Sequence, residues 1–389
     1  MKKKVVIYYT STHYLDVILE TIQSIKKDVE LHVFIEVTPS SKNTTIIDVE
    51  SLDGMNFIET PERLLGTESW NKLKNYFEGV SSVHFVVHTH KRALSFESMR
   101  KAYSLGKYLK QYKADIVHFD SVTTRAIGLY PYLRSKKVFI AIHDPLQHSG
   151  EADWKEKVPP FVFYKLAKGF FFYSKFARDQ FKSYYTKLKA PFHVIKLQPY
   201  TFVSQFLDKK KTNSNTILFF GRVSYYKGID LLLDAIPEIL KHYPNEKFVI
   251  AGKPSYGYKM DETIVNQYKN NVEVIARFLS TEELVGLIQD SKFVICPYRD
   301  ATQSGVVMTT FATGKMVIAT DVGSFSEYIT DNVDGFLAAP DPAAIAAKII
   351  QALNGDRYKQ IEEKLNPGYS EETGKLNREV ILAAYEQKK

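Results

Sequence analysis

The sequence predicts an α/β protein with two Rossmann-like domains, each built on a parallel sheet with helices on both faces. Short apolar runs alternate with amphipathic helical stretches along both halves of the chain. The length of 389 residues exceeds what one ordinary core accommodates. A polar segment of linker composition, 208–215 (DKKKTNSN), lies between the halves. We therefore expect one domain over 1–207 and a second over 208–370.

The first domain is expected to be built on strands that recur at short intervals. The expected strands are Val5–Thr10, Leu31–Val37, His84–His88, Ile116–Phe119, Val138–His143, Phe170–Tyr173 and His193–Leu197. Amphipathic segments such as Leu15–Ile25 and Ser98–Tyr112 separate these strands and are expected to be helices. Because strands and helices alternate, parallel pairing is favoured.

The second domain repeats this alternation without sharing the sequence of the first. Its expected strands are Ile217–Phe220, Phe248–Ala251, Val272–Ala276, Phe293–Cys296, Met316–Ala319 and Phe336–Ala338. Its expected helices are Ile229–His242, Glu282–Gln289, Gly305–Thr313 and Ala343–Leu353. A last helix is expected at Glu371–Gln387, after the helix-breaking Asn366-Pro367-Gly368.

The composition is that of a globular protein, with 44% hydrophobic and 25% charged residues. No apolar run reaches the roughly 18–20 residues that cross a bilayer. The basic start, MKKKVVIYYT, lacks the apolar region and cleavage site of a signal peptide, so we expect a strand there. The only cysteine, Cys296, excludes an intrachain disulfide and fits a reducing cytoplasm. It lies in an apolar run, where a buried structural thiol is expected.

Charge is unevenly distributed between the two halves. Residues 1–210 carry 32 Lys and Arg against 21 Asp and Glu, a net +11, and residues 211–389 carry 20 against 23, a net −3, which together give +8. A basic half indicates an anionic partner, such as a membrane surface or a nucleic acid. No nucleic-acid-binding motif accompanies the charge, so a nucleic acid is not expected as a partner.

The stretch ILFFGRVSYYKG (217–228) carries the strongest functional signal. A buried strand ends at Gly221-Arg222, and a helical pattern begins after Lys227-Gly228. Ligands bind at the carboxyl ends of strands in open α/β sheets. An arginine presents a planar fork and a lysine a movable charge, so together they suit a diphosphate. The alternative interpretation is two surface cations beside a helix.

The segment Gln303-Ser304-Gly305 precedes a predicted helix. Ser304 is a favourable N-cap, and the free N–H groups at a helix start bind anions. If Arg222 and Lys227 converge on the same sheet edge, all three groups serve one anion site. A plain N-cap without a ligand is the alternative.

Four segments between 216 and 355 resemble, in order and spacing, the donor-binding domain of the retaining GT-B glycosyltransferases of family 4. They are FFGRVSYYKGIDLLLDA (219–235), FVIAGK (248–253), VEVIARFLSTEELVGLIQDSKFVICPY (272–298) and QSGVVMTTFATGKMVIATDVGSFSEYI (303–329). The resemblance implies the GT-B fold, in which two Rossmann-like domains with parallel sheets face a central cleft. It also implies that the last helix packs back on the first domain.

The resemblance implies a hexosyltransferase-type enzyme that moves a sugar from a nucleotide-diphosphate sugar to a glycan or lipid-linked acceptor, with retention. In that scheme Arg222 and Lys227 bind the diphosphate and, with His143, are the catalytic residues. The remaining donor-binding positions are Gly221, Gly228, Lys253, Arg277, Gln303, Ser304, Gly305, Val306, Thr309 and Glu327. No metal or other cofactor is expected, because protein cations and helix dipoles neutralise the leaving diphosphate in this scaffold.

The sequence departs from the family where two glutamates, eight positions apart, are usual. Counting back from Gly314, these positions hold Ala301 and Thr309. The second glutamate commonly binds the donor ribose, and a threonine offers only a weaker neutral hydrogen bond. Some related sequences share the Gln-Ser-Gly loop, so we interpret a variant enzyme. The alternatives are a non-catalytic sugar-nucleotide-binding or partner protein and, as a further enzyme class, a same-fold epimerase or phosphorylase.

In the first half, IVHFDS (116–121) and IAIHDPLQHSGE (140–151) are similar to later strands of the family. His143 matches a histidine that lies beside the donor sugar, where an imidazole can orient a hydroxyl or a phosphate. His118 and Asp120 end the adjacent strand and are expected on the acceptor side. Purely structural roles are the alternative for all three residues.

His88 and His90 alternate along an expected strand and could share a metal ion. No second cluster supplies further ligands, so we favour a cluster that borders the acceptor cleft.

Residues 155–189 interleave nine cations and eleven aromatics with two acids, which suits an anionic membrane surface or a lipid-linked acceptor. A buried strand at Gly169–Tyr173, flanked by solvated lysines, is the alternative. We therefore expect a cytoplasmic enzyme of cell-surface polysaccharide or glycoconjugate assembly, with peripheral contact to the inner face of the plasma membrane as a hypothesis.

Overall fold

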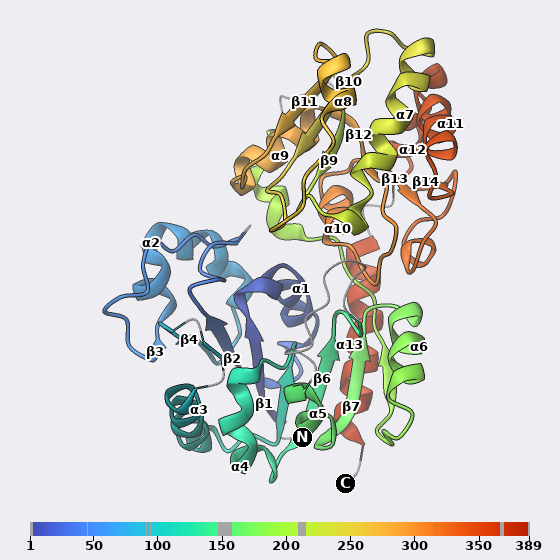
Figure 1. Cartoon of the computed structure of the whole chain (residues 1–389). Helices are drawn as coiled ribbons and strands as arrows, with labels where there is room; N and C mark the ends of the chain where they lie inside the picture. Colours follow the sequence, from blue (N-terminus) through green and yellow to red (C-terminus); the bar gives the residue numbers. More distant parts are fainter. Residues whose placement is uncertain are drawn as a thin grey trace.

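The computed structural model describes residues 3–44, 46–90, 92–93, 95–146, 158–208, 215–365 and 369–387, with the backbone alone described at 158–160. Two sheets form two domains that lie one above the other in Figure 1. The chain ends in a long helix that returns to the first domain and is drawn in red.

The first sheet has eight strands in the order β3-β4-β2-β1-β5-β6-β7-β8. They are β1 Val5–Ser11, β2 Glu30–Val37, β3 Ile58–Glu59, β4 Ser82–Val87, β5 Ile116–Phe119, β6 Lys137–Ile142, β7 Ala167–Phe172 and β8 Phe192–Val194. The neighbouring strands pair in parallel, apart from the antiparallel edge strand β3. The sequence did not predict β3, because two residues are too few to show an alternating pattern.

Helices cover both faces of this sheet, as the alternation of side chains along β1 requires. Val6 and Tyr8 pack toward a layer that contains α1 (Leu15–Ile25), α2 (Pro61–Leu73) and α13 (Tyr369–Glu386). Ile7 and Tyr9 pack toward the opposite layer. That layer contains α3 Phe96–Leu109, α4 Tyr130–Leu133, α5 Val158–Tyr164 and α6 Lys175–Tyr184.

The second sheet has six parallel strands in the order β11-β10-β9-β12-β13-β14. They are β9 Thr216–Phe220, β10 Lys247–Ala251, β11 Val272–Ile275, β12 Ser291–Cys296, β13 Val317–Thr320 and β14 Gly335–Ala338. Its helices are α7 Ile229–His242, α8 Thr263–Gln267, α9 Thr281–Asp290, α10 Gly305–Ala312, α11 Pro342–Leu353 and α12 Arg357–Glu362. The strand order reverses between β9 and β12, and ligands bind at such switch points in open α/β sheets.

The predicted fold class is confirmed, and each expected strand is present with its bounds shifted by a few residues at most. The apolar run of β7 is core, since Phe170, Phe171 and Phe172 are fully buried. Cys296 is buried as expected, and burial raises the pKa of its thiol to about 12. No helix in the described ranges is both long and apolar enough to span a bilayer.

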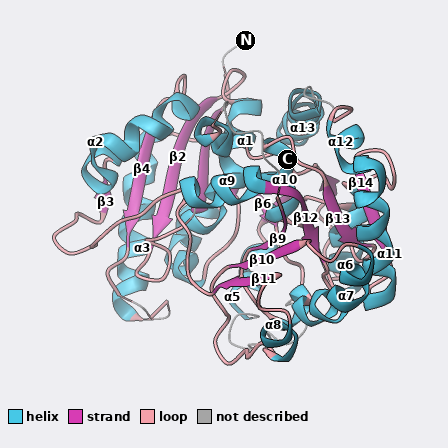
Figure 2. Cartoon of the chain, turned by 90° about the horizontal axis from the view of Figure 1, so that it is seen from above, coloured by secondary structure: helices cyan, strands magenta, loops and turns pink. Residues whose placement is uncertain are grey.

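Two segments join the domains. The short 3-10 helix η6 (Thr201–Phe206) leaves the first domain and packs against α9 and α10 of the second. Helix α13 then packs along α1, and its Tyr385 hydroxyl lies 2.6 Å from His118 Nδ1. The predicted boundary at 207/208 lies between the last strand of one sheet and the first strand of the other. In the view from above, α10 lies close to the middle of the molecule (Figure 2).

Candidate functional site

The carboxyl edges of the two sheets face each other and are in direct contact. His143 follows β6 of the first sheet, and Gln303 precedes α10 of the second; Gln303 Nε2 lies 2.9 Å from His143 Nδ1. Beside this contact, Thr302 donates through its hydroxyl to the Asp144 carboxylate. Ser174 donates to the Thr302 carbonyl at 3.1 Å. Two sequence-predicted residues, His143 of the first domain and Gln303 of the second, therefore meet at this edge.

His143 is held from behind by a buried carboxylate. Its Nε2 lies 3.0 Å from Oδ2 of Asp120, which ends β5 and is fully buried. The other oxygen, Oδ1, accepts hydrogen bonds from the Tyr8 and Tyr173 hydroxyls at 3.1 and 2.7 Å. Tyr14 stacks on the imidazole, with ring centroids 3.9 Å apart and planes 17° apart. These contacts fix the ring plane and place a proton on Nε2.

The charge of His143 depends on two opposing effects. Burial alone lowers the pKa of the imidazole, but the Asp120 carboxylate, the hydrogen bond to it and the nearby Asp144 raise the pKa above its ordinary value. A neutral ring accepts the Gln303 N–H at Nδ1, whereas a charged ring needs the amide oxygen there. A half-turn of the Gln303 amide therefore serves either protonation state. Gln303 Oε1 is buried without a hydrogen-bond partner among the described residues.

The second edge is formed mainly by close backbone contacts. Gly228 has φ +63°, and a Cβ there would lie 2.0 Å from the Pro297 carbonyl oxygen. Gly221 has φ +116°, and a Cβ there would lie 3.3 Å from Val306 of α10. Both positions therefore need glycine, because an L side chain rarely adopts these φ values. The loop after β9 thus lies directly against β12 and the start of α10.

The two predicted cations flank this loop in different environments. Lys227 is 9% exposed, and its Nζ lies 3.8 Å from the centroid of the Tyr298 ring. Arg222 is exposed, and its Nη2 donates to the Tyr226 hydroxyl at 3.4 Å. Lys253 lies two residues after the neighbouring β10, and its carbonyl accepts from Val223 N at 3.1 Å. All three cations therefore belong to the carboxyl edge of the second sheet.

Helix α10 begins at this edge with the cap that the sequence predicted. The Ser304 hydroxyl accepts from Val307 N at 3.4 Å. Gly305 lies under Tyr200 of the first domain, since a Cβ there would be 3.2 Å from the tyrosine ring. In the adjoining loop, the buried Ser224 Oγ has no hydrogen-bond partner within the described ranges. Unsatisfied buried polar atoms are uncommon, so Ser224 Oγ and Gln303 Oε1 indicate where a polar ligand fits.

Three residues predicted to bind the donor make contacts within the protein that differ from those of the cations beside the loop after β9. Arg277 is exposed and forms a bidentate pair with Glu283, with distances of 3.1 and 2.7 Å. Thr309 is buried within α10. Glu327 accepts from Lys175 N and Phe176 N, both at 2.8 Å, and so caps α6 of the first domain. In this arrangement Glu327 links the two domains.

Asp120 and His118, the two residues predicted on the acceptor side, lie in different places relative to the cleft. Asp120 lies behind His143, so its carboxylate acts on the cleft through the imidazole. His118 is buried between β5 and α13, where burial lowers the pKa of its imidazole to about 4. It bonds to Tyr385 at the back of the sheet, so this position gives His118 a packing contact between β5 and the last helix.

The two histidines after β4 point to different partners. His88 is buried, lies 3.7 Å from the Glu36 carboxylate and has a pKa lowered to about 3 by burial. His90 lies 2.9 Å from Glu97. Among the residues that the structure describes, no group of three or more His, Cys, Asp or Glu side chains could hold a metal ion.

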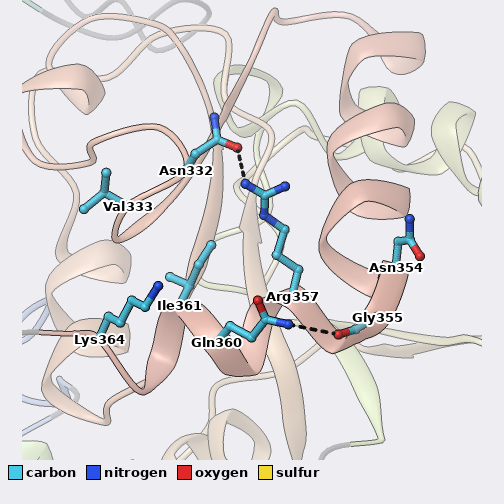
Figure 3. A pocket seen from close by; sticks show the side chains of 8 residues that line it. All are labelled: Asn332, Val333, Asn354, Gly355, Arg357, Gln360, Ile361 and Lys364. Carbon is cyan, nitrogen blue, oxygen red and sulfur yellow. Dashed lines mark hydrogen bonds between the residues drawn. The ribbon is translucent and has the colours of Figure 1, made fainter.

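A hollow of about 400 Å³ lies at the opposite edge of the second sheet (Figure 3). It is lined by Asn332, Val333, Asn354, Gly355, Arg357, Gln360, Ile361 and Lys364. Its polar groups bond to one another: Arg357 donates to Asn332 Oδ1 at 3.2 Å, and Gln360 donates to the Gly355 carbonyl at 3.3 Å. Because it lies at the amino ends of the strands, this hollow is separate from the candidate site.

Sequence reasoning missed the aromatic residues around His143, namely Tyr8, Tyr14 and Tyr173. Tyr8 and Tyr173 lie in apolar strands, where the sequence indicates core. Tyr14 lies between the expected strand Val5–Thr10 and the expected helix Leu15–Ile25, where no pattern singles it out. The available signal was the position of Asp120 at the end of the strand that pairs with β6. Adjacent strand ends bring their side chains together, and a buried carboxylate needs donors.

The fold is the two-domain GT-B fold, as comparison with solved structures shows. HepE of Anabaena, solved in complex with UDP and glucose, superposes with a TM-score of 0.66 at 13% identity, over 99% of this chain and 100% of that chain. The catalytic domain of starch synthase IV from Arabidopsis thaliana, bound to ADP and acarbose, gives 0.67 at 13% identity, also over 99% and 100%.

Residues 214–355, in the second domain, match the family model described as glycosyl transferases group 1. An uncharacterized glycosyltransferase of Methanocaldococcus jannaschii is 30% identical over 145 residues, 37% of each chain. The D-inositol 3-phosphate glycosyltransferase of Corynebacterium aurimucosum is 28% identical over 155 residues, 38% of this chain and 37% of the relative. These matches thus span less than two fifths of either relative.

Proposed function

We propose that this protein is a glycosyltransferase that moves a sugar from a nucleotide-diphosphate sugar to a hydroxyl acceptor. The contact between His143 and Gln303 carries the proposal, because it joins the histidine edge of one sheet to the cationic edge of the other. The family match of residues 214–355 supports it. So do the names of the solved neighbours, which include bound UDP with glucose and bound ADP with acarbose.

In the proposed reaction the anomeric C–O bond of the donor breaks, and the diphosphate leaves with the electron pair. The acceptor oxygen bonds to the anomeric carbon, and its proton passes to a phosphate oxygen or to water. Negative charge develops on the diphosphate, where Arg222, Lys227 and the amides at the start of α10 lie. These positive groups supply the neutralisation, so we propose no metal ion. Retention of configuration is proposed from the family resemblance.

His143 acts from the other side of the cleft. Asp120 holds Nε2 and fixes the imidazole. Nδ1, which Gln303 contacts in this structure, is the ring nitrogen that meets the sugar or its phosphate once the donor takes the place of the Gln303 amide. Closure around the donor excludes water and favours transfer over hydrolysis.

The acceptor is proposed to be a glycan or a lipid-linked glycan in the assembly of cell-surface polysaccharide or glycoconjugates. Two relatives bear names with lipid acceptors: a phosphatidylinositol N-acetylglucosaminyltransferase subunit of Arabidopsis thaliana and a phosphatidyl-myo-inositol mannosyltransferase of Mycobacterium tuberculosis. Both match about 40% of this chain or less. We propose a cytoplasmic protein that reaches such acceptors at the inner face of the plasma membrane.

The test is a thermal-shift screen of UDP-, GDP- and ADP-sugars, followed by a transfer assay with the sugar that binds. A ligand specific for the folded state raises Tm by mass action. Arg222→Ala should weaken both the shift and the transfer, whereas the distant Lys269→Ala should not. Binding without transfer or hydrolysis would favour a non-catalytic sugar-nucleotide-binding protein. Transfer that survives Arg222→Ala unchanged would contradict the proposed diphosphate site.

A further inference from the structure

Helix α3 presents an outer face that the described part of the chain leaves uncovered. Phe96 is 85% exposed, Met99 46% and Tyr103 48%. These residues are spaced three and four apart, so they lie on one side of the helix. Ala102, Leu105 and Leu109 form the buried side. Large apolar side chains gathered on one exposed helix face are a signature of an interaction surface.

Cations share this face with the apolar residues. Arg100, Lys107 and Lys110 are exposed, and each lies within about 40° of Phe96 around the helix axis at 100° per residue. Lys107 Nζ lies 4.8 Å from the centroid of the Tyr103 ring. We call six residues the outer face of α3: Phe96, Met99, Arg100, Tyr103 and Lys107 of the helix, and Lys110, which directly follows it at the start of the 3-10 helix η3 (Lys110–Tyr112).

Glu97, the acidic residue in the first turn of α3, lies to one side of the outer face. Glu97 is turned by about 100° from Phe96, and its carboxylate contacts Lys101 at 3.1 Å and His90 at 2.9 Å. The outer face of α3 therefore combines three apolar and three cationic side chains without a carboxylate among its members.

We propose that the outer face of α3 docks on an anionic membrane surface. Aromatic and apolar side chains enter the headgroup region, while lysine and arginine bind anionic lipid headgroups. Charge complementarity favours this occupant, since residues 1–210 carry a net +11. A second helix of this layer, α5, packs on the same 3-10 helix η4 (Thr124–Leu129) as α3 does. Its Phe161 is 44% exposed, with Lys165 Nζ 4.8 Å from the ring centroid.

The start of α3 is fixed to the cleft edge of the first sheet. Arg125 donates to the carbonyls of His90 and Arg92, at 2.9 and 3.1 Å, in the loop that precedes α3. Its guanidinium also lies 4.0 Å from Glu36 near the end of β2. A docked α3 therefore keeps the carboxyl edge that carries His143 close to the lipid surface. This deepens the proposed function, on which it rests only for the identity of the acceptor.

The experiment is flotation of the full chain with vesicles of phosphatidylcholine alone or with 30% phosphatidylglycerol. Arg100→Gln/Lys107→Gln should lower the partition coefficient for the anionic vesicles about 30-fold, since each surface cation contributes roughly fivefold. Phe96→Ser/Tyr103→Ser should lower it roughly tenfold. All four side chains are exposed, so folding should be retained and is checked by Tm.

Matched control variants lie on other surfaces. Lys259→Gln/Lys269→Gln removes the same charge from the second domain, and Val333→Ser/Leu376→Ser removes two exposed apolar side chains elsewhere. Both should bind vesicles as the unmodified chain does. The proposal is overturned if the unmodified chain ignores anionic vesicles, if neutral vesicles bind it equally, or if the α3 variants match the controls. Capture of an acidic protein by the same face without vesicle binding also overturns it. None of these readouts requires sugar transfer, so they fail separately from the proposed function.

Discussion

The carboxyl edges of the two sheets are held together by different kinds of contact, side-chain hydrogen bonds at one and close backbone packing at the other. At the first edge, side chains make the structure: Asp120 collects Tyr8, Tyr173 and His143 around one buried carboxylate. At the second edge, the backbone makes it: Gly228 lies against the Pro297 carbonyl. The hydrogen bonds to Asp120 hold the His143 imidazole in one orientation. A backbone-lined edge with cations leaves room for a ligand to supply the missing partners.

This difference assigns the two edges to different tasks. The first edge orients a ring whose Nε2 hydrogen bond is already made to Asp120 inside the first domain. The second edge holds positive charge, the start of α10 and a buried hydroxyl, Ser224 Oγ, without a partner in the described chain. Orientation and charge neutralisation are thus separated between the two domains, and they combine when the edges meet.

The largest effect is expected when the buried charge of the second edge is removed by substitution. Lys227→Met keeps the apolar stem over Tyr298 and deletes the ammonium. We expect kcat/KM for the donor to fall about 1,000-fold, or about 4 kcal/mol, because a group aimed at developing charge in a closed site has effects of this size. Tm should stay near its original value, because no ammonium then has to be buried. A fall in kcat/KM of less than tenfold would contradict the proposal that the second edge neutralises the charge of the leaving diphosphate.

The next largest effect is expected when the buried carboxylate of the first edge is replaced by an amide. Asp120→Asn keeps the size of the side chain but can no longer hold the His143 N–H as a carboxylate does. We expect transfer to fall about 100-fold, a size typical of a positioned acid–base group, with the KM for the donor nearly unchanged. Tyr8→Phe removes one of the three donors and should have a smaller effect. If Asp120→Asn instead raised KM alone, the first edge would be binding the donor and not orienting a ring.

The same variant has a pH signature. The folded pKa of His143 is raised above its ordinary value, so protonation of the ring stabilises the fold. That contribution is complete below about pH 6.5 and is lost as the pH rises through the folded pKa. The difference in Tm between the unmodified chain and Asp120→Asn should therefore shrink as the pH rises above about 6.5. A difference that grew with pH would show that the carboxylate does not favour the charged ring.

Local features of the site were visible in the sequence, and distant ones were not. The loop from Gly221 to Gly228 and the cap at Ser304 depend on residues within a few positions of each other, so pattern and turn chemistry predicted them. The Asp120–His143 pair joins residues 23 positions apart, and its tyrosines come from three further segments. The role of Glu327 depends on how the domains sit together, which no periodicity encodes.

Glu327 tests the contact between the edges with a moderate expected effect. Its carboxylate caps the positive start of α6 across the interface, a contribution of up to about 2 kcal/mol. Glu327→Gln should loosen the closed arrangement and raise the KM for the donor about fivefold, with kcat nearly retained. Small-angle scattering of the ligand-free protein should show a larger radius of gyration, and Glu371→Gln on α13 is the matched control. A fall in kcat with unchanged KM and radius would mean that Glu327 leaves α6 and contacts the reacting sugar.

The smallest expected effect concerns Arg277, a cation that follows β11, the outermost strand of the second sheet. Arg277 is exposed and paired with Glu283, so its charge is already satisfied and largely screened by solvent. Arg277→Gln should change donor affinity and kcat/KM by less than about twofold, because exposed ion pairs contribute about 0–1 kcal/mol. The measurement is donor titration by thermal shift, beside Lys227→Met. If Arg277→Gln weakened donor binding tenfold, the nucleotide would extend past β10 to the outer strand. The second edge would then bind its ligand with side chains as the first edge does, and the contrast between the two would be lost.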